Sequence, residues 1–333
     1  MEKIRVGVIG CSGMAQAHMR GVLACDYAAL CAICDTDRAL AEKTSRDFPD
    51  AQVYFDAEEM LASAALDAVI IVTPDRTHRA LCEAALAHGL HVLCEKPLAL
   101  TNEDCRAIVA AAEKSDRKFM VGQICRYTPG FVKAKELIDE GRIGRLTFVE
   151  SEYAHDYKKI LNPGTWRYDP LRNGVVGGGC HAIDLLRWVA GDAQEVTAYS
   201  TQSRTDLPYD DTTVAILRFA DGVIGKVFVS ISCKRDYTMR SVFYGTKGTI
   251  LTDNTSPSMT LFYEDDTQGG KLCREEIPID IKNHNAQGEF AEFARIIRDD
   301  LPVSTSAIEG AKTVETAIAI VTSSERGGEK ICL

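Results

Sequence analysis

Short apolar runs alternate with amphipathic stretches of helical period along the first third of the chain. Several of the runs are continuously apolar, which is typical of parallel strands that are covered on both faces. The expected strands are Ile4–Ile9, Ala28–Cys34, Gln52–Tyr54, Ala68–Val72, His91–Cys94 and Phe119–Gln123. This alternation predicts a doubly wound, Rossmann-type α/β domain over residues 1–123.

Residues typical of helix ends support this alternation. Thr101 and Asp104 have the spacing of a capping box before an alanine-rich helix. Gly89 is placed to end the helix 79–88.

The pattern changes after residue 124, where long strands follow one another with few helices between them. A helix at Phe131–Glu140 comes first, and Asp221-Gly222 between two strands predicts a hairpin. The expected strands are Leu146–Tyr153, Glu195–Thr201, Thr213–Phe219, Val223–Ser232 and Ser241–Tyr244, and two helices, Ala286–Arg298 and Ala307–Ser323, follow them. Residues 124–333 are therefore predicted to form a second α/β domain with a large, mostly antiparallel, open-faced sheet.

Composition narrows the classes of function. The chain has 333 residues, of which 46% are hydrophobic and 26% charged, as in an ordinary soluble enzyme of two domains. A net charge of -10 without basic clusters argues against a nucleic-acid partner. We expect no membrane partner, because no apolar stretch is long enough to span a bilayer and no signal segment stands at the start. The twelve cysteines are then expected to be reduced thiols in a cytoplasmic protein.

Cys31 and Cys34 form a C-x-x-C pair, which raises the question of metal or redox chemistry. Their odd spacing within a strand points the two side chains to opposite faces. A second pair to complete a tetrahedral site is absent nearby, so no metal site is expected.

A glycine-rich turn joins the first expected strand to the first expected helix. Gly10, Ser12 and Ala15 occupy the three positions of the dinucleotide fingerprint, with Gly13 and Met14 between them. Small residues let the backbone approach a pyrophosphate, whose charge the helix N-terminus stabilises. The turn therefore predicts a dinucleotide-binding site.

Asp35 ends the second strand, where an acid accepts hydrogen bonds from the adenosine ribose hydroxyls. A 2′-phosphate would be repelled there, which favours NAD over NADP. Arg38 nearby could instead accommodate such a phosphate. In the alternative, Asp35 or Asp37 caps the next helix.

Two further segments lie at the carboxyl ends of expected strands, where an open α/β sheet binds its ligand. Thr73 and Pro74 are placed to contact the nicotinamide half of the cofactor. His78 either joins them or is a cap or a surface residue at the start of the next helix. Glu95 and Lys96 follow a later strand, and Lys96 is placed to meet the reactive end of the dinucleotide.

In the second domain, His181 and Asp184 stand three apart on an expected helix, which puts both on one face. The preceding run 177–179 is all glycine and allows close approach of a backbone. A histidine can take the hydroxyl proton when a carbinol is oxidised and return it in the reverse reaction. This helix is therefore predicted to carry active-site residues.

Together these motifs resemble the glucose-fructose oxidoreductase / inositol dehydrogenase / rhizopine catabolism family over nearly the whole chain. The motifs are Gly10-x-Ser12-x-x-Ala15, Glu95-Lys96-Pro97, Arg126-Tyr127-x-Pro129, Trp166-Arg167, His181-x-x-Asp184 and residues 244–249. The resemblance implies a Rossmann domain, a second domain whose open sheet makes oligomer contacts, and oxidation or reduction of a sugar or cyclic polyol.

The resemblance also implies residue roles, with Lys96 as the catalytic lysine and His181 as the acid/base. Many members have an aspartate four residues before the histidine, but this chain has Gly177. Either Lys96 and His181 suffice, Asp184 or Asp156 substitutes, or the chemistry differs. The further residues expected to contact a sugar ring are Arg126, Tyr153, Asp156, Trp166 and Arg167.

The predicted function is hydride transfer between a nicotinamide cofactor, NAD rather than NADP, and a secondary hydroxyl of a sugar or inositol-like polyol. Two alternatives stay open: transient oxidation by tightly bound NAD during elimination or glycoside cleavage, and a non-catalytic dinucleotide sensor. We also expect a homodimer or homotetramer that pairs through the open sheet, with Val223, Val227 and Val229 on the pairing face.

Overall fold

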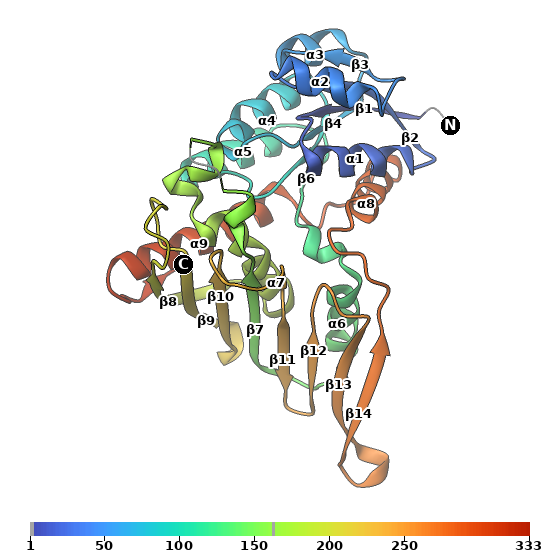
Figure 1. Cartoon of the computed structure of the whole chain (residues 1–333). Coiled ribbons are helices and arrows are strands. Elements are labelled where there is room, and N and C mark those ends of the chain that lie inside the picture. Colours follow the sequence, from blue (N-terminus) through green and yellow to red (C-terminus); the bar gives the residue numbers. More distant parts are fainter. Residues whose placement is uncertain (1–2, 162–163) are drawn as a thin grey trace. The chain divides into compact units, whose positions relative to one another are not determined.

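The computed structural model describes residues 3–161 and 164–333 and divides the chain into two compact units (Figure 1). The first unit comprises Met1–Gln123 and Asn285–Ala311, and the second comprises Ile124–His284 and Lys312–Leu333. The sequence analysis assigned all residues after 123 to one domain, whereas the structure returns 285–311 to the first unit. The reason is that α8 (Ala286–Arg298) packs its apolar side against α1 (Gly13–Leu23).

The first unit contains a six-stranded sheet in the order β3-β2-β1-β4-β5-β6. All its pairings are parallel, as expected for a doubly wound sheet. Its strands are β1 (Ile4–Ile9), β2 (Ala28–Cys34), β3 (Gln52–Tyr54), β4 (Ala68–Ile71), β5 (His91–Cys94) and β6 (Phe119–Val121). The helices of the crossovers are α1, α2 (Arg38–Ser45), α3 (Ala57–Ser63), α4 (His78–Ala87) and α5 (Asn102–Glu113). The predicted Rossmann domain is confirmed, because the buried apolar runs form its strands.

The helix boundaries read from the sequence are also found. The Thr101 side chain accepts a hydrogen bond from the Asp104 backbone, so Thr101 caps α5 as expected; the Asp104 carboxylate accepts from the Thr101 hydroxyl and not from the backbone N–H that a capping box uses. Gly89 follows the end of α4 with a φ of +72°, a conformation that glycine adopts without strain.

The second unit contains a nine-stranded sheet in the order β14-β13-β12-β11-β7-β10-β9-β8-β15. Only the pairing of β7 with β10 is parallel among the described pairs, so the sheet is mostly antiparallel. Its strands are β7 (Leu146–Ala154), β8 (Ala193–Thr201), β9 (Thr212–Phe219), β10 (Ile224–Ser230), β11 (Ser241–Gly245), β12 (Gly248–Thr252), β13 (Ser258–Asp265), β14 (Lys271–Pro278) and β15 (Ile331–Cys332). The β9–β10 hairpin turns at Asp221 and Gly222, as predicted.

Helices α6 (Pro129–Asp139) and α7 (Cys180–Ala190) cover one face of this sheet, and the end of α9 (Ala307–Glu325) lies against β8 (Figure 1). The other face is open, and β9 alternates strictly between buried and exposed positions. Val223, Val227 and Val229 are buried, so the prediction that they form the pairing face is wrong. The period of two was read correctly, but a strand alone does not indicate which face the helices cover.

Strands β12 to β15 were not predicted from the sequence. β13 and β14 form one end of the sheet, and β14 is mostly exposed with charged residues along its length. β14 therefore carries no periodic apolar signal, whereas Met259 and Leu261 of β13 are buried at a period of two, a signal that was present in the sequence and was missed.

All twelve cysteines lie in the part of the chain that the structure describes, and no disulfide joins them there. Among the described residues, no helix is both long and apolar enough to cross a bilayer.

Candidate functional site

The turn between β1 and α1 has the shape that a dinucleotide pyrophosphate needs. Gly10 has a φ of +106°, and a Cβ there would lie 2.3 Å from the carbonyl oxygen of Val72. Ser12 and Gly13 are exposed, and a Cβ on Gly13 would meet nothing within 4 Å. Ser12 precedes α1 without capping it by its side chain, and the first turn has no acidic residue, so the helix N-terminus can face an anion. Ala15 is buried and Met14 half-buried behind this turn.

The Asp35 carboxylate is held against the glycine-rich turn. It accepts hydrogen bonds from the backbone N–H of Cys11 and of Asp37, both at 2.9 Å. Asp37, and not Asp35, is the cap of α2, because its side chain accepts from the Leu40 backbone. The guanidinium of Arg38 lies 4.2 Å from the centre of the Phe55 ring. Asp35 therefore remains available at the edge where an adenosine ribose is expected.

His78 ties together the segments that follow β4 and β5. It is fully buried as the first residue of α4, with Nδ1 3.0 Å from the Pro97 carbonyl and Nε2 3.1 Å from the Thr73 carbonyl. Burial opposes protonation, but Cys94, Asp75 and the Thr73 carbonyl together raise the pKa of His78 to about 10. Within this unit, His78 thus holds the segments after β4 and β5 together through hydrogen bonds to their backbones. Of the two other residues predicted in the first segment, Thr73 is half-buried and Pro74 is exposed.

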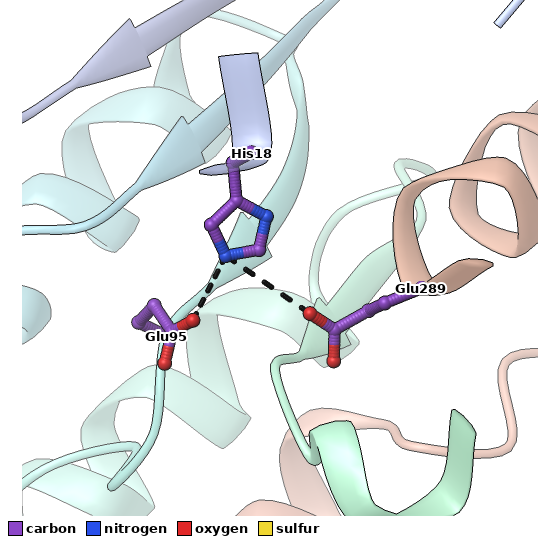
Figure 2. Close-up of side chains that lie close together, drawn as sticks. All are labelled: His18, Glu95 and Glu289. Carbon is purple, nitrogen blue, oxygen red and sulfur yellow. Dashed lines mark hydrogen bonds and ion pairs between the residues drawn. The ribbon is translucent and has the colours of Figure 1, made fainter. Parts of the chain in front are cut away.

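Glu95 and Lys96 follow β5 directly. The buried Glu95 carboxylate accepts a hydrogen bond from the Lys96 backbone N–H at 3.1 Å, and the Lys96 side chain is half-buried. The other Glu95 oxygen lies 2.8 Å from Nε2 of His18 on α1. Glu289 on α8 completes the group, with a carboxylate oxygen 4.0 Å from the same nitrogen (Figure 2). We call His18, Glu95 and Glu289 the buried triad.

The pKa values of the two carboxyl groups of the buried triad are shifted in opposite directions. Burial alone would raise the pKa of Glu95, but the hydrogen bond from His18 and the charge of Lys96 lower it. Burial and the nearby charge of Glu95 raise the pKa of Glu289 well above its usual range. The sequence analysis singled out neither His18 nor Glu289. The available signal was a polar residue among the apolar positions of each helix, next to Met19 and Phe290.

In the second unit, His181 is the second residue of α7, which follows directly on the short π-helical segment Val175–Gly179. Each glycine of the run 177–179 is closely approached by another residue: a Cβ would lie 2.5 Å from Arg172 at 177, 2.4 Å from Tyr153 at 178, and 2.6 Å from Val229 at 179. The glycine run is therefore a packing requirement of this helix start. At 177, where many family members have an aspartate, the space is taken by the Arg172 guanidinium.

Aromatic side chains surround His181. Tyr153 stacks on it with ring centres 5.9 Å apart, and His284 lies 5.8 Å away. Tyr157 lies 2.7 Å from Tyr153 through the two hydroxyls, and Tyr237 lies near both Tyr153 and His284. Burial raises the pKa of Tyr153 well above its usual range, so this hydroxyl stays protonated. Tyr237 and His284 were missed in the sequence because they lie on loops far along the chain, without a motif.

Asp184 is engaged with Arg126 rather than with an open site. Its two oxygens accept from the Arg126 guanidinium at 3.0 and 2.7 Å, and the Thr313 hydroxyl lies 3.3 Å from one of them. His181 and Asp184 lie on a common face of α7, as predicted, because both contact the short segment η2 (Ile124–Tyr127). His181 contacts Cys125 of this segment at 3.6 Å, and Asp184 contacts Arg126. Two residues predicted as substrate and catalytic groups thus form one buried ion pair.

The other predicted substrate residues lie in the segment before α7. Asp156 caps a short turn through the Lys158 backbone and lies 3.5 Å from Lys234. Trp166 is 40% exposed, and the guanidinium groups of Arg167 and Arg172 lie 4.3 and 4.4 Å from its ring centre. Within the second unit, the exposed Trp166 ring thus lies against two guanidinium groups, of which that of Arg172 is buried.

Comparisons with known proteins agree with this reading of the two units. Residues 4–123 match the model of an oxidoreductase family with an NAD-binding Rossmann fold, and residues 131–251 match the GFO/IDH/MocA C-terminal domain. Inositol 2-dehydrogenase 2 of Saccharopolyspora erythraea is 31% identical over 74% of this chain and 72% of its own. Inositol 2-dehydrogenase of Paracoccus denitrificans is 29% identical over 99% of this chain and 96% of its own.

The solved structures show the same fold. A levoglucosan dehydrogenase in complex with NADH superposes with a TM-score of 0.93 at 23% identity, covering 99% of each chain. The chain therefore belongs to the Gfo/Idh/MocA family of NAD-binding oxidoreductases.

Proposed function

We propose that this protein is an NAD-dependent dehydrogenase of a secondary hydroxyl on a sugar or cyclic polyol. The observation that carries this proposal is the placement of Lys96 at the carboxyl end of β5, in the same sheet whose β1–α1 turn is shaped for a dinucleotide. The relatives named as inositol 2-dehydrogenases support the substrate class. Another relative, 32% identical, is named as a dehydrogenase of a carboxylated dihydroxycyclohexadiene, which is also a cyclic diol.

The proposed chemistry divides the work between the cofactor and the side chains. The cofactor accepts hydride when bound. Lys96 donates a hydrogen bond to the substrate oxygen and stabilises its developing negative charge. His181 takes the hydroxyl proton, in an aromatic setting formed with Tyr153. The cofactor residues are proposed to be Gly10, Ser12, Gly13, Met14, Ala15, Asp35, Thr73, Pro74 and Glu95, with His78 acting through the backbones it orders. The substrate residues are proposed to be Tyr153, Asp156, Trp166 and Arg167.

A screen of free sugars and inositols for NADH formation tests this proposal. Net formation of NADH from a polyol, followed by its absorbance, supports a dehydrogenase. Conversion of a substrate without net NADH would favour the alternative of transient oxidation by bound NAD. Dinucleotide binding without turnover of any polyol would favour a sensor.

Asp35 is expected to set the preference for NAD. Its carboxylate would face a 2′-phosphate, and like charges a few ångströms apart repel by about 1–4 kcal/mol near a surface. Asp35→Ser should therefore narrow the affinity difference between NAD and NADP by about tenfold. Fluorescence titration of both cofactors measures this.

Asp37→Ser is the matched control, since it also removes a carboxylate but keeps an acceptor for the α2 cap. It should leave the cofactor preference unchanged. Tighter binding of NADP than of NAD by the unaltered protein would show that the assignment of Asp35 is wrong.

We propose that the open face of the nine-stranded sheet pairs two or more copies. Exposed apolar residues lie on neighbouring strands of this face: Tyr199, Val214, Ile216, Ile224 and Tyr244. In this proposal these exposed residues form the contact surface, in place of the three valines predicted from the sequence, which are buried. Ile216→Asp should weaken association by at least tenfold, because it places about one charge per copy in an apolar contact. Light scattering measures the change in mass.

Leu23→Asp, at an apolar residue of α1 that is even more exposed than Ile216, is the control and should not alter the mass. A monomeric unaltered protein at micromolar concentration would contradict the proposal. We further propose a cytoplasmic location, because twelve cysteines scattered through a long chain are typical of reduced thiols. We also propose that the protein has no nucleic-acid partner, since a net charge of -10 repels phosphates.

A further inference from the structure

The buried triad places two carboxyl groups beside one histidine in the interior of the first unit. His18 comes from α1, Glu95 from the segment after β5, and Glu289 from α8 (Figure 2). His18 and Glu289 are fully buried and Glu95 is 7% exposed. An unpaired charge is costly away from water, so each of these three ionisable side chains must be either paired with an opposite charge or neutral.

The packing around the triad brings these elements close together. Gly21 on α1 lets α8 approach, since a Cβ there would lie 3.2 Å from the Ala286 carbonyl. Gly122 similarly lets the chain pass Glu95, since a Cβ there would lie 3.3 Å from the Glu95 Cα. The Glu95 backbone N–H donates to Ile71 at 2.9 Å. Glu95 is therefore fixed on its backbone as well as on its carboxylate.

Hydrogen bonds distinguish the two carboxyl groups. Glu95 accepts from His18 through one oxygen and from the Lys96 backbone through the other. Both Glu289 oxygens are buried and have no hydrogen-bond partner among the described residues. Two ionised carboxylates this close to each other are disfavoured, so the one with donors is ionised and the other keeps its proton. The raised pKa of Glu289 agrees with this assignment.

We propose that Glu289 is a positioning residue that stores a proton beside the Glu95–Lys96 segment and releases it when an oxidised dinucleotide binds. The inference rests on the proposed function in so far as Lys96 lies next to the nicotinamide. The oxidised ring is positively charged and the reduced ring is neutral. The added positive charge favours the ionised form of Glu289, as the field of Lys96 already does in part.

The step is a simple ionisation. The O–H bond of Glu289 breaks, the proton passes to solvent buffer, and the carboxylate keeps the electron pair. The groups that face Glu289 are His18 from α1 and Glu95 with Lys96 from the segment after β5. Glu95 disfavours ionisation of Glu289, while Lys96 favours it. The Glu289–Glu95 pair therefore carries one more negative charge when the bound cofactor is oxidised than when it is reduced. Glu289 affects Lys96 through Glu95.

A divalent cation is the other means of compensating two buried carboxylates. The ligating atoms of the triad lie within 4.8 Å of one another. An ionised Glu95 can only accept, so His18 Nε2 then donates across their 2.8 Å contact, and a nitrogen that carries a hydrogen cannot also bind a metal. The hydrogen bond therefore favours a stored proton, and the experiment includes cation binding as a contrary outcome.

Proton release on cofactor binding tests the proposal directly. Oxidised NAD is mixed with the full-length protein in weakly buffered solution containing a pH indicator. The unaltered protein should release up to about one proton per site, and Glu289→Gln, which imitates the protonated acid, should release none. Glu292→Gln removes a partly exposed carboxylate of the same helix and should behave like the unaltered protein. NADH should release no proton from any of the three proteins.

The affinity for NAD should show the same linkage. A group that loses a proton on binding makes binding tighter as pH rises, between its pKa in the complex and its higher pKa in the free protein. The Kd for oxidised NAD should fall by up to tenfold per pH unit in that window, and the Kd for NADH should not. Glu289→Gln should remove this slope, whereas a purely structural role would shift both affinities at every pH.

Infrared difference spectra decide whether Glu289 holds a proton without any cofactor. The carbonyl stretch of a protonated carboxylic acid should be present in the unaltered protein and absent from Glu289→Gln. Absence of this band, equal proton release with NAD and NADH, or binding of Zn²⁺ or Mn²⁺ that depends on Glu289 would each overturn the proposal. If neither dinucleotide binds, the proposed function itself fails, while the infrared band still reports on Glu289.

Discussion

Replacement of Lys96 by methionine should reduce turnover by about a hundredfold or more, the usual scale for a positioned acid/base group. Methionine keeps much of the length of lysine but removes the charge and the hydrogen-bond donors that would stabilise the substrate oxygen. Binding of NAD should be largely intact, because the glycine-rich turn and Asp35 hold the other half of the cofactor in this proposal. Single-turnover NADH formation and a fluorescence titration separate the two effects.

Lys133→Met provides the matched control. Lys133 lies on α6 in the second unit, where it pairs with Glu136 at the surface, and its loss should leave turnover unchanged. His181→Ala should resemble Lys96→Met in rate and should also remove a titration step near neutral pH. Near-normal rates in both Lys96→Met and His181→Ala would show that the fold serves another chemistry.

The first unit could be predicted almost completely from the sequence. Its strands are continuous apolar runs, and each run is bounded by a residue with a local role, such as Gly10, Gly89 or Thr101. Each of these signals depends only on residues that are close together in the chain, so it can be read from one sequence without knowing the tertiary contacts. The return of α8 to this unit could not be predicted, because it depends on a contact between α1 and α8 that are far apart in the chain.

The second unit was predicted less completely for the same physical reason. The hairpin at Asp221 was correct because its turn is local. The covered face of β10 was assigned wrongly because both faces of an alternating strand look alike until the helices are placed. The buried triad was missed because it joins three elements, and the partner of each side chain is set by packing alone.

Asp184→Ala should destabilise the second unit by about 3–5 kcal/mol, because it leaves the buried Arg126 guanidinium without its carboxylate. The side chains of this pair are 7% and 3% exposed, so water does not replace the lost interaction. In thermal unfolding the midpoint of the second unit should fall by roughly 6–20 °C. Glu136→Ala, which removes the partner of Lys133 at the surface, should cost at most about 1 kcal/mol.

The double variant Arg126→Met, Asp184→Leu separates structure from catalysis. Apolar residues of similar volume often replace a buried ion pair at little cost, so this variant should recover most of the lost stability. If Asp184 serves only to hold Arg126, turnover per folded molecule should recover with it. If Asp184 instead orients His181 in place of the acid absent at Gly177, turnover stays low although the fold is restored. A double variant no more stable than Asp184→Ala would contradict the ion-pair account, because the cost would then lie outside the Arg126–Asp184 contact.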